Sequence, residues 1–195
     1  MENKKNMKKL IKSSDPNAVL EACNALGKGE IIAYPTDTLY GLGCDSKNEH
    51  SIKKLNKIKN RSGPISVIAP NRSTAIDWMF VKKNHKATIK NKLKNGNTVI
   101  ASIKNNICSN LIAGNKNTVG IRVPDHLFCK KLSKLFPHPI TSTSVNRTGE
   151  KPLTKPDDIS NEFISDIDLI IDDGIINGVG SKIFLFKYGF WKQLR

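Results

Sequence analysis

The chain has 195 residues, of which 38% are hydrophobic, and its mean hydropathy of -0.37 is typical of one well-buried soluble domain. No apolar run approaches the roughly 20 residues of a membrane-spanning helix, so we expect no membrane association. With 32 Lys and Arg against 17 Asp and Glu, the net charge of +15 predicts either a solvated basic surface or attraction of a polyanion, a nucleotide or RNA.

The four cysteines lie far apart and form no C-x-x-C pair, so neither a zinc site nor a disulfide framework is expected. This pattern favours a reduced, cytoplasmic location. Residues 1–12 are polar and lysine-rich, which predicts a disordered or frayed basic N-terminus without a secretory signal. Because no long Pro/Gly/Ser linker follows, residues 13–195 are predicted to form a single domain.

Helix-like and strand-like segments alternate, which predicts an α/β fold. A first helix begins at Asp15-Pro16 and ends at Gly27, and a strand at 30–34 ends at Pro35. A lysine-rich helix with apolar residues on one side then leads into Lys59. The later expected elements are strands at 64–69, 97–103, 118–123, 139–143 and 167–171, helices at about 71–80, 84–94 and 125–136, and a terminal hairpin of 182–186 with 190–194.

Five short segments place polar groups at strand ends, where open α/β sheets bind ligands. In the first, Thr36-Asp37-Thr38 follows a strand and precedes a double-glycine turn at Gly41 and Gly43. The threonines either satisfy loop backbone or contact a ligand, and the glycines are expected to take positive φ.

The second and third segments supply cations. Lys59 and Arg61 alternate on a segment expected to be non-helical, so both can contact one phosphate chain, although a solvated surface would look the same. Arg122 lies inside an otherwise apolar strand, where burial of an unpaired charge is costly. A structural salt bridge and a ligand carboxylate explain Arg122 equally well.

The fourth and fifth segments supply neutral polar groups. Ser144 and Asn146 lie in the hydroxyl-rich run 141–149, which suits phosphate or metal-bound water and equally a capping turn. A flexible Gly-rich loop then leads to Ser181. The chain contains no G-x-x-x-x-G-K-[ST], G-x-G-x-x-G or H-E-x-x-H motif and no Ser/His/Asp candidate set, so a nucleotide site must be of another kind.

Together and in order, the five segments resemble the YrdC/Sua5 family of threonylcarbamoyl-AMP synthases over nearly all of residues 29–195. The resemblance implies a YrdC-like twisted, open mixed β-sheet flanked by helices, with a basic concave cavity, in the short single-domain form. The family reaction joins L-threonine, bicarbonate or CO₂ and ATP into L-threonylcarbamoyl-AMP and pyrophosphate. The product passes to the machinery that transfers threonylcarbamoyl to tRNA in t⁶A synthesis.

The resemblance also implies roles for ten residues. Lys59 and Arg61 would hold the ATP phosphates as the catalytic residues. The ATP side would also include Thr118, Asn146, Thr154 and Arg195, and the threonine side would consist of Thr36, Arg122, Ser144 and Ser181. Mg²⁺ would be bound through ATP, with Asn146 as its one protein contact and no direct protein metal cluster.

Two departures from the family pattern bear on affinity. The loop after Arg61 is shorter than usual, and Ile68 stands where many members have a histidine. Two other hypotheses therefore stay open: an RNA-binding module of the same fold that holds double-stranded RNA or tRNA by phosphate contacts, and a divergent relative, such as a carbamoyl-adenylate-forming maturation domain or a regulatory protein.

Overall fold

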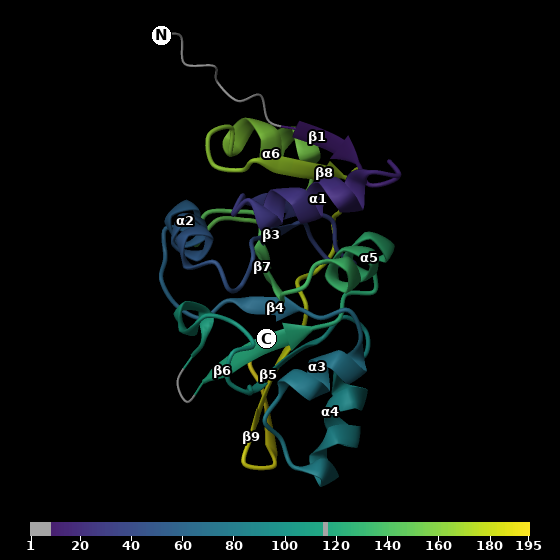
Figure 1. Ribbon diagram of the computed structural model, residues 1–195, viewed down its shortest axis with the longest axis vertical. Coiled ribbons are helices and arrows are strands. Elements are labelled where there is room, and N and C mark those ends of the chain that lie inside the picture. The colour runs from purple at the N-terminus through teal and green to yellow at the C-terminus, as the bar shows by residue number, and fades with distance from the viewer. Residues whose placement is uncertain (1–8, 115–116) are drawn as a thin grey trace.

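The structure is a computed structural model that describes residues 9–114 and 117–195 (Figure 1). The strands are β1 (Lys9–Lys12), β2 (Ile32–Tyr34), β3 (Gly41–Gly43), β4 (Ser66–Ile68), β5 (Thr98–Ser102), β6 (Thr118–Arg122), β7 (Ile140–Ser144), β8 (Leu169–Asp172), β9 (Ile183–Lys187) and β10 (Phe190–Gln193). The α-helices are α1 (Ala18–Gly27), α2 (Glu49–Lys59), α3 (Arg72–Trp78), α4 (Lys86–Lys92), α5 (Leu127–Leu135) and α6 (Pro156–Glu162). Short 3₁₀ turns lie at Lys83–His85 and Asn110–Ile112.

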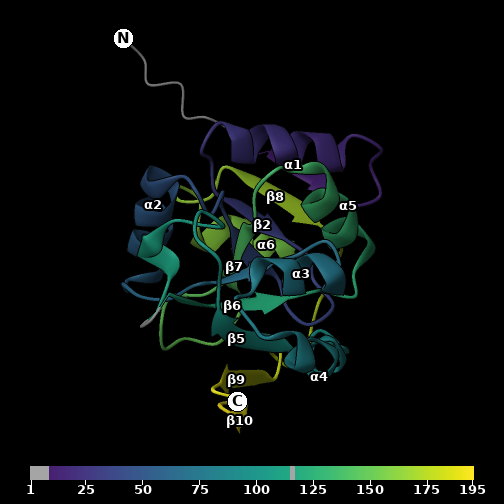
Figure 2. The same ribbon diagram turned by 60° about the horizontal axis from the view of Figure 1, so that its bottom comes forward.

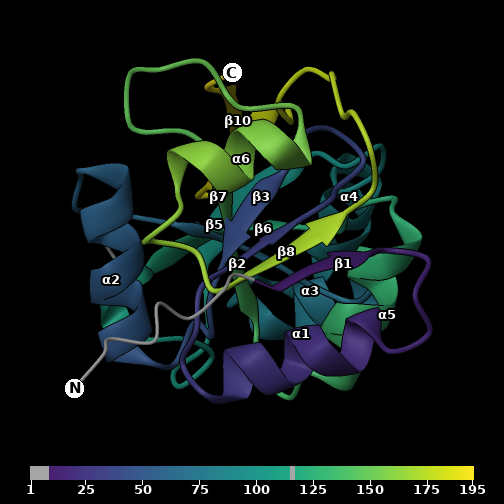
Figure 3. The ribbon, with the colours of Figure 1, turned by 90° about the horizontal axis from the view of Figure 1, so that it is seen from above.

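All ten of these strands belong to one mixed sheet in the order β1-β8-β2-β3-β7-β4-β6-β5-β9-β10. Figure 2 shows α1 near one end of this sheet and the β9–β10 hairpin at the other. In Figure 3, α1 and α5 lie on one side of β8 and β2, and α6 lies on the opposite side. The predicted α/β class with a twisted, open mixed sheet is confirmed.

Two apolar cores follow from the alternation of side chains along the strands. In β2, Ile32 and Tyr34 pack with α1 and α5, whereas the neighbouring Ala33 faces the other core. The second core contains Ile52 and Leu55 of α2, which confirms the apolar side predicted for that helix. No helix in the described residues is long and apolar enough to span a bilayer.

Three elements differ from the sequence-based predictions. Residues 9–12, expected to be frayed, form β1, because they pair in parallel with β8 and Ile11 is buried against α1. The remainder of that N-terminal prediction, residues 1–8, lies outside the described residues. Helix α6, with Pro156 at its start, was not predicted at all.

The expected double-glycine turn is also wrong, since Gly41–Gly43 is strand β3. Neither glycine has positive φ. A Cβ at Gly43 would lie 2.6 Å from Cε1 of Tyr34, so glycine is required here for close packing against the tyrosine ring. By contrast, the hairpin turn at Tyr188 and Gly189 is as predicted, with φ of 53° and 88°, which are values of a type I′ turn.

Candidate functional site

Strand alternation creates a cavity of about 700 Å³ over the middle of the sheet, within the size range of small-molecule sites. Ser66, Ile100 and Gly120 face it, while Val67, Val99 and Ile121 face the core. Nine of the ten predicted residues line it: Thr36, Lys59, Arg61, Thr118, Arg122, Ser144, Asn146, Ser181 and Arg195. Four of these are cations, and no Asp or Glu of the described chain belongs to the lining.

Lys59 lies at the last turn of α2, not on a non-helical segment as predicted. The residue is 2% exposed, and Asn60, in the left-handed conformation with φ 49°, ends the helix directly after it. Its Nζ donates to Ser144 O at 2.7 Å, Asn146 O at 2.5 Å and Asn146 Oδ1 at 2.7 Å. All three protons of the ammonium group are therefore used within the protein.

The side chain of Asn146 completes the hydrogen-bond network around Lys59. Its Oδ1 accepts from Lys59 and from Ser144 Oγ at 2.6 Å, and its Nδ2 donates to the backbone oxygens of Arg147 and Glu150. Thr148 closes the loop on α2 through a 2.6 Å bond to Lys59 O. The side chain of Asn146 thus has its full set of four hydrogen bonds, and it fixes the loop that forms one wall of the cavity.

Burial and the nearby Arg61 charge lower the pKa of Lys59 to about 8. The three acceptor oxygens around Nζ favour the charged form, so Lys59 carries its charge at neutral pH. No carboxylate pairs with it in the described residues. This corner of the cavity is therefore positive.

Arg61 differs from Lys59 because it keeps unused donors. Its Nη2 makes one long bond of 3.4 Å to Thr143 Oγ1, and its Nε is buried with no hydrogen-bond partner. Desolvation lowers the pKa of the guanidinium, which still remains charged at any physiological pH. Arg61 is therefore the cation best placed to grip an anionic ligand by a bidentate contact.

Thr36 holds the first segment in shape. Its Oγ1 donates to Leu39 O at 2.7 Å and accepts from the backbone nitrogens of Thr38 and Leu39 at 3.2 Å. The hydroxyl is thus occupied within a local turn, as the structural alternative in the sequence suggested. Thr38, which the sequence did not single out as a site residue, projects instead toward Arg122.

Arg122 is paired with a carboxylate. Its Nη2 lies 2.6 Å from Asp37 Oδ1, with both side chains largely buried, and its Nη1 donates to Thr38 Oγ1 at 3.2 Å. The Nε of Arg122 is buried without a partner. The sequence pattern contained the signal for Asp37, since it stands between the two threonines, but only the fold brings it to a strand 85 residues away.

The remaining predicted residues lie at the open side of the cavity, with one exception. Ser181 Oγ is 2.9 Å from Thr98 Oγ1, and Arg195 Nε donates to Ser181 O at 3.0 Å. Thr118 begins β6 and lines the cavity. Thr154 does not line it, because Leu153 is bonded back to Val145 and the chain then turns away into α6.

The described residues offer little to a directly bound metal ion. They contain no group of three His, Cys, Asp or Glu side chains that could hold one. Asn146, the predicted contact for Mg²⁺, already has both acceptor positions of Oδ1 occupied. A magnesium ion here would have to be held mainly by a ligand's own phosphates.

The fold and this cavity define an α/β protein with a cationic, hydroxyl-lined site for an anionic small molecule. The family model Sua5_yciO_yrdC, described as "Telomere recombination", matches residues 24–195, and the chain belongs to this family. The expected family membership is confirmed.

Curated relatives match most of the chain. A protein of Idiomarina loihiensis named threonylcarbamoyl-AMP synthase is 28% identical over 84% of this chain and 95% of its own length. One of Photobacterium profundum with the same name is 32% identical, covering 78% of this chain and 84% of the relative. These relatives are matched over most of their length by this chain.

Solved structures show the same fold. YciO of E. coli superposes with a TM-score of 0.85 at 21% identity, over 97% of this chain and 93% of that chain. P. abyssi Sua5 complexed with L-threonine also gives a TM-score of 0.85, at 23% identity, over 97% of this chain and 57% of the longer Sua5 chain.

Proposed function

We propose that this protein is an L-threonylcarbamoyladenylate synthase, an enzyme that forms threonylcarbamoyl-AMP and pyrophosphate from L-threonine, bicarbonate or CO₂, and ATP. The observation that carries the proposal is the convergence of nine of ten family-matched residues, from six separate segments, on one cavity. The synthase names of relatives that align over most of their length support it.

The proposed reaction requires no protein nucleophile. The amine of threonine captures CO₂ as a carbamate, whose oxygen forms a bond to the α-phosphorus of ATP while the bond to pyrophosphate breaks. The protein would contribute positioning and charge stabilisation, as in other phosphoryl-transfer sites. The cavity suits this role, because its lining combines cations with hydroxyl groups such as Ser66, Ser142 and Thr143.

The contacts suggest different roles for the two cations of the ATP side. Arg61 has unused donors, so it would grip the phosphates and offset the charge that develops on the leaving pyrophosphate. Lys59, whose donors all point to the Ser144–Asn146 loop, would act by fixing that wall and by its charge. On the threonine side, Nε and Nη1 of Arg122 would face the substrate carboxylate beside Ser181.

We further propose that Mg²⁺ enters with ATP, coordinated by phosphate oxygens, and supplies additional charge neutralisation when bound. The product would pass to the threonylcarbamoyl-transfer machinery for tRNA in the cytoplasm. Thr154, Arg195 and Thr118 would complete the nucleotide side, with Thr154 requiring a movement of its segment because it does not line the cavity.

The test is a product assay with the full chain, ATP, Mg²⁺, bicarbonate and L-threonine, in which pyrophosphate and the adenylate are measured. We expect threonine-dependent product, and a loss in kcat/KM of roughly a hundredfold or more for Arg61→Ala, because it removes the free phosphate donor. Arg72→Ala, on the surface helix α3 outside the cavity, is the matched control and should retain activity.

Absence of threonine-dependent product would overturn the synthase proposal. If the same preparation instead bound double-stranded RNA with a steep salt dependence, the RNA-binding alternative would replace it. Product formed with serine in place of threonine, and not with threonine, would indicate a relative with another substrate.

A further inference from the structure

The positive charge of the chain is concentrated in part of the fold. Residues 78–122 and 174–195 contain thirteen of the 32 Lys and Arg and none of the 17 Asp and Glu. Lys116, one of the thirteen, lies outside the described residues. The described parts of these two segments include α4, β5, β6 and the β9–β10 hairpin, which lie together at one end of the sheet (Figure 2). These segments are therefore strongly basic, and one carboxylate from elsewhere in the chain, that of Asp37, reaches them to pair with Arg122 beside Gly96. The remaining excess of cations attracts anions.

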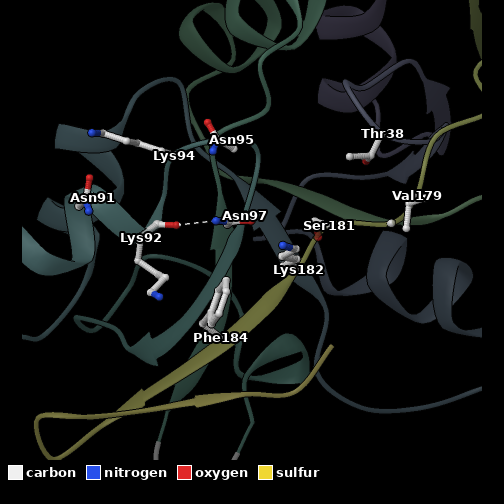
Figure 4. A pocket seen from close by; sticks show the side chains of 11 residues that line it. Thr38, Asn91, Lys92, Lys94, Asn95, Asn97, Val179, Ser181, Lys182 and Phe184 are labelled. Atoms are coloured by element: carbon white, nitrogen blue, oxygen red, sulfur yellow. Dashed lines mark hydrogen bonds between the residues drawn. The ribbon is translucent and has the colours of Figure 1, made fainter.

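A second cavity, of about 550 Å³, opens at this basic end, between the C-terminal end of α4 and the start of β9. Figure 4 shows Lys92 and Lys182 on either side of Phe184, with Lys94 extending outward on the rim. Asn97 Nδ2 donates to Lys92 O at 3.1 Å, which ties the end of α4 to the turn before β5. The cavity is therefore shaped by fixed backbone as well as by side chains.

The lysines of this second cavity have no acidic partner. Lys92, Lys94 and Lys182 take part in no ion pair with a described carboxylate, and no Asp or Glu lines the cavity. The aromatic ring present, Phe184, already carries the Lys92 ammonium 4.3 Å from its centroid. An unpaired group of ammonium ions with amide donors suits compact oxyanions, whereas the occupied ring does not favour stacking of a nucleobase.

The two cavities are separate but share a wall. Thr38, Val179, Gly180 and Ser181 line both of them. The loop that carries Ser181 is seated closely, because a Cβ at Gly178 would overlap the backbone carbonyl of Thr38. An anion in the second cavity would therefore lie directly behind the loop that delivers Ser181 to the first.

We propose that this second cavity is an anion-binding site for a small inorganic phosphate chain, with inorganic pyrophosphate as the representative ligand. Lys92 and Lys182 supply the binding charge, and Lys94 adds to it from the rim. This site is distinct from the one that holds ATP in the proposed function. Its ligand binds without turnover, so the test below does not depend on the synthase reaction.

The experiment is calorimetric titration of pyrophosphate into the full chain without Mg²⁺ at about 0.15 M salt, where long-range fields are screened beyond roughly 8 Å. The double variant Lys92→Gln/Lys182→Gln should weaken binding on the order of tenfold or more, as expected for loss of charge-assisted contacts. The control Lys83→Gln/Lys187→Gln removes the same charge from the same end of the molecule, outside the cavity, and should weaken binding less than about threefold.

Two further arms separate this site from the first cavity. Arg61→Ala, in the first cavity, should not weaken pyrophosphate binding, and Lys182→Gln, in the second, should weaken it. Equal losses in the two double variants would mean a general surface field, and a loss in Arg61→Ala with none in Lys182→Gln would mean that pyrophosphate binds in the first cavity. Either result overturns the proposal. Because Lys92 also packs on Phe184 and Trp191, Lys182→Gln alone is measured as well.

Discussion

At the corner where α2 meets the β7 loop, the buried Lys59 is surrounded by carbonyl and amide oxygens, and no described carboxylate pairs with it. At the opposite corner, the buried Arg122 is paired with Asp37 at 2.6 Å. The first corner is therefore positive and suits a polyanion, whereas the second is close to neutral and suits a zwitterion. ATP phosphates and an amino acid are ligands of these two kinds, so the charge pattern favours the phosphates at the Lys59 corner and the amino acid at the Arg122 corner. Ser144, predicted on the threonine side, lies at the Lys59 corner.

The largest expected effect comes from removing the ion pair between Arg122 and Asp37. Asp37→Asn leaves the buried guanidinium of Arg122 without a countercharge, so we expect a loss of about 3–5 kcal/mol in the free energy of unfolding. Urea denaturation measures it. Asp77→Asn, at an exposed position of α3, is the control and should stay within about 0.5 kcal/mol. A change as small as the control's would show that the pair does not neutralise this corner.

A smaller loss is expected at the positive corner. Asn146→Ala removes the amide oxygen that accepts hydrogen bonds from Lys59 and Ser144, and the amide nitrogen that donates to two loop carbonyls. The loss should lower the free energy of unfolding by about 1–3 kcal/mol. The comparison is Asn17→Ala, an exposed residue before α1 whose side chain makes no capping bond. If Asn146→Ala lowered the stability no more than Asn17→Ala in thermal and urea unfolding, the hydrogen bonds of Asn146 would not be what stabilises the loop after β7.

The smallest effect concerns pH. With a Lys59 pKa of about 8, roughly a tenth of the Lys59 side chains remain protonated at pH 9, so the KM for ATP should rise several-fold between pH 7 and 9. Lys59→Arg should flatten this profile while pH dependence from ATP itself is unchanged. An equally steep rise in the variant would assign the titration to another group.

Although ATP binding should weaken between pH 7 and 9, the titration of Lys59 should increase folding stability above about pH 8. The unfolded chain binds the Lys59 proton more tightly, with a pKa of about 10.4. The free energy of unfolding contributed by Lys59 therefore increases from about pH 8 to about pH 10.4. Loss of ATP affinity at pH 9 without loss of thermal stability would separate this titration from alkaline unfolding.

Much of the fold could be predicted from local patterns. The helix at Glu49–Lys59, the strands β5, β6 and β9, and the Tyr188-Gly189 turn follow from periodicity and turn chemistry. Strands β1 and β3 could not be predicted, since Lys9–Lys12 is a strand only because β8 lies beside it and Gly41–Gly43 only because it pairs with β2 and β7. The glycines are needed there because the Tyr34 ring occupies the space of a Cβ.

The site shows the same division at the level of single residues. The order of its polar segments in the sequence determined the family, and with it nine side chains that share one cavity. That order could not distinguish Lys59 from Arg61, because K-x-R has the same pattern whether both cations face a ligand or only one does. The tertiary structure decided it: Lys59 meets oxygens that are 85 and 87 residues away, while Arg61 keeps a free donor. Hydrogen bonds between segments so distant in the chain depend on how the sheet is assembled, and local sequence carries no record of them.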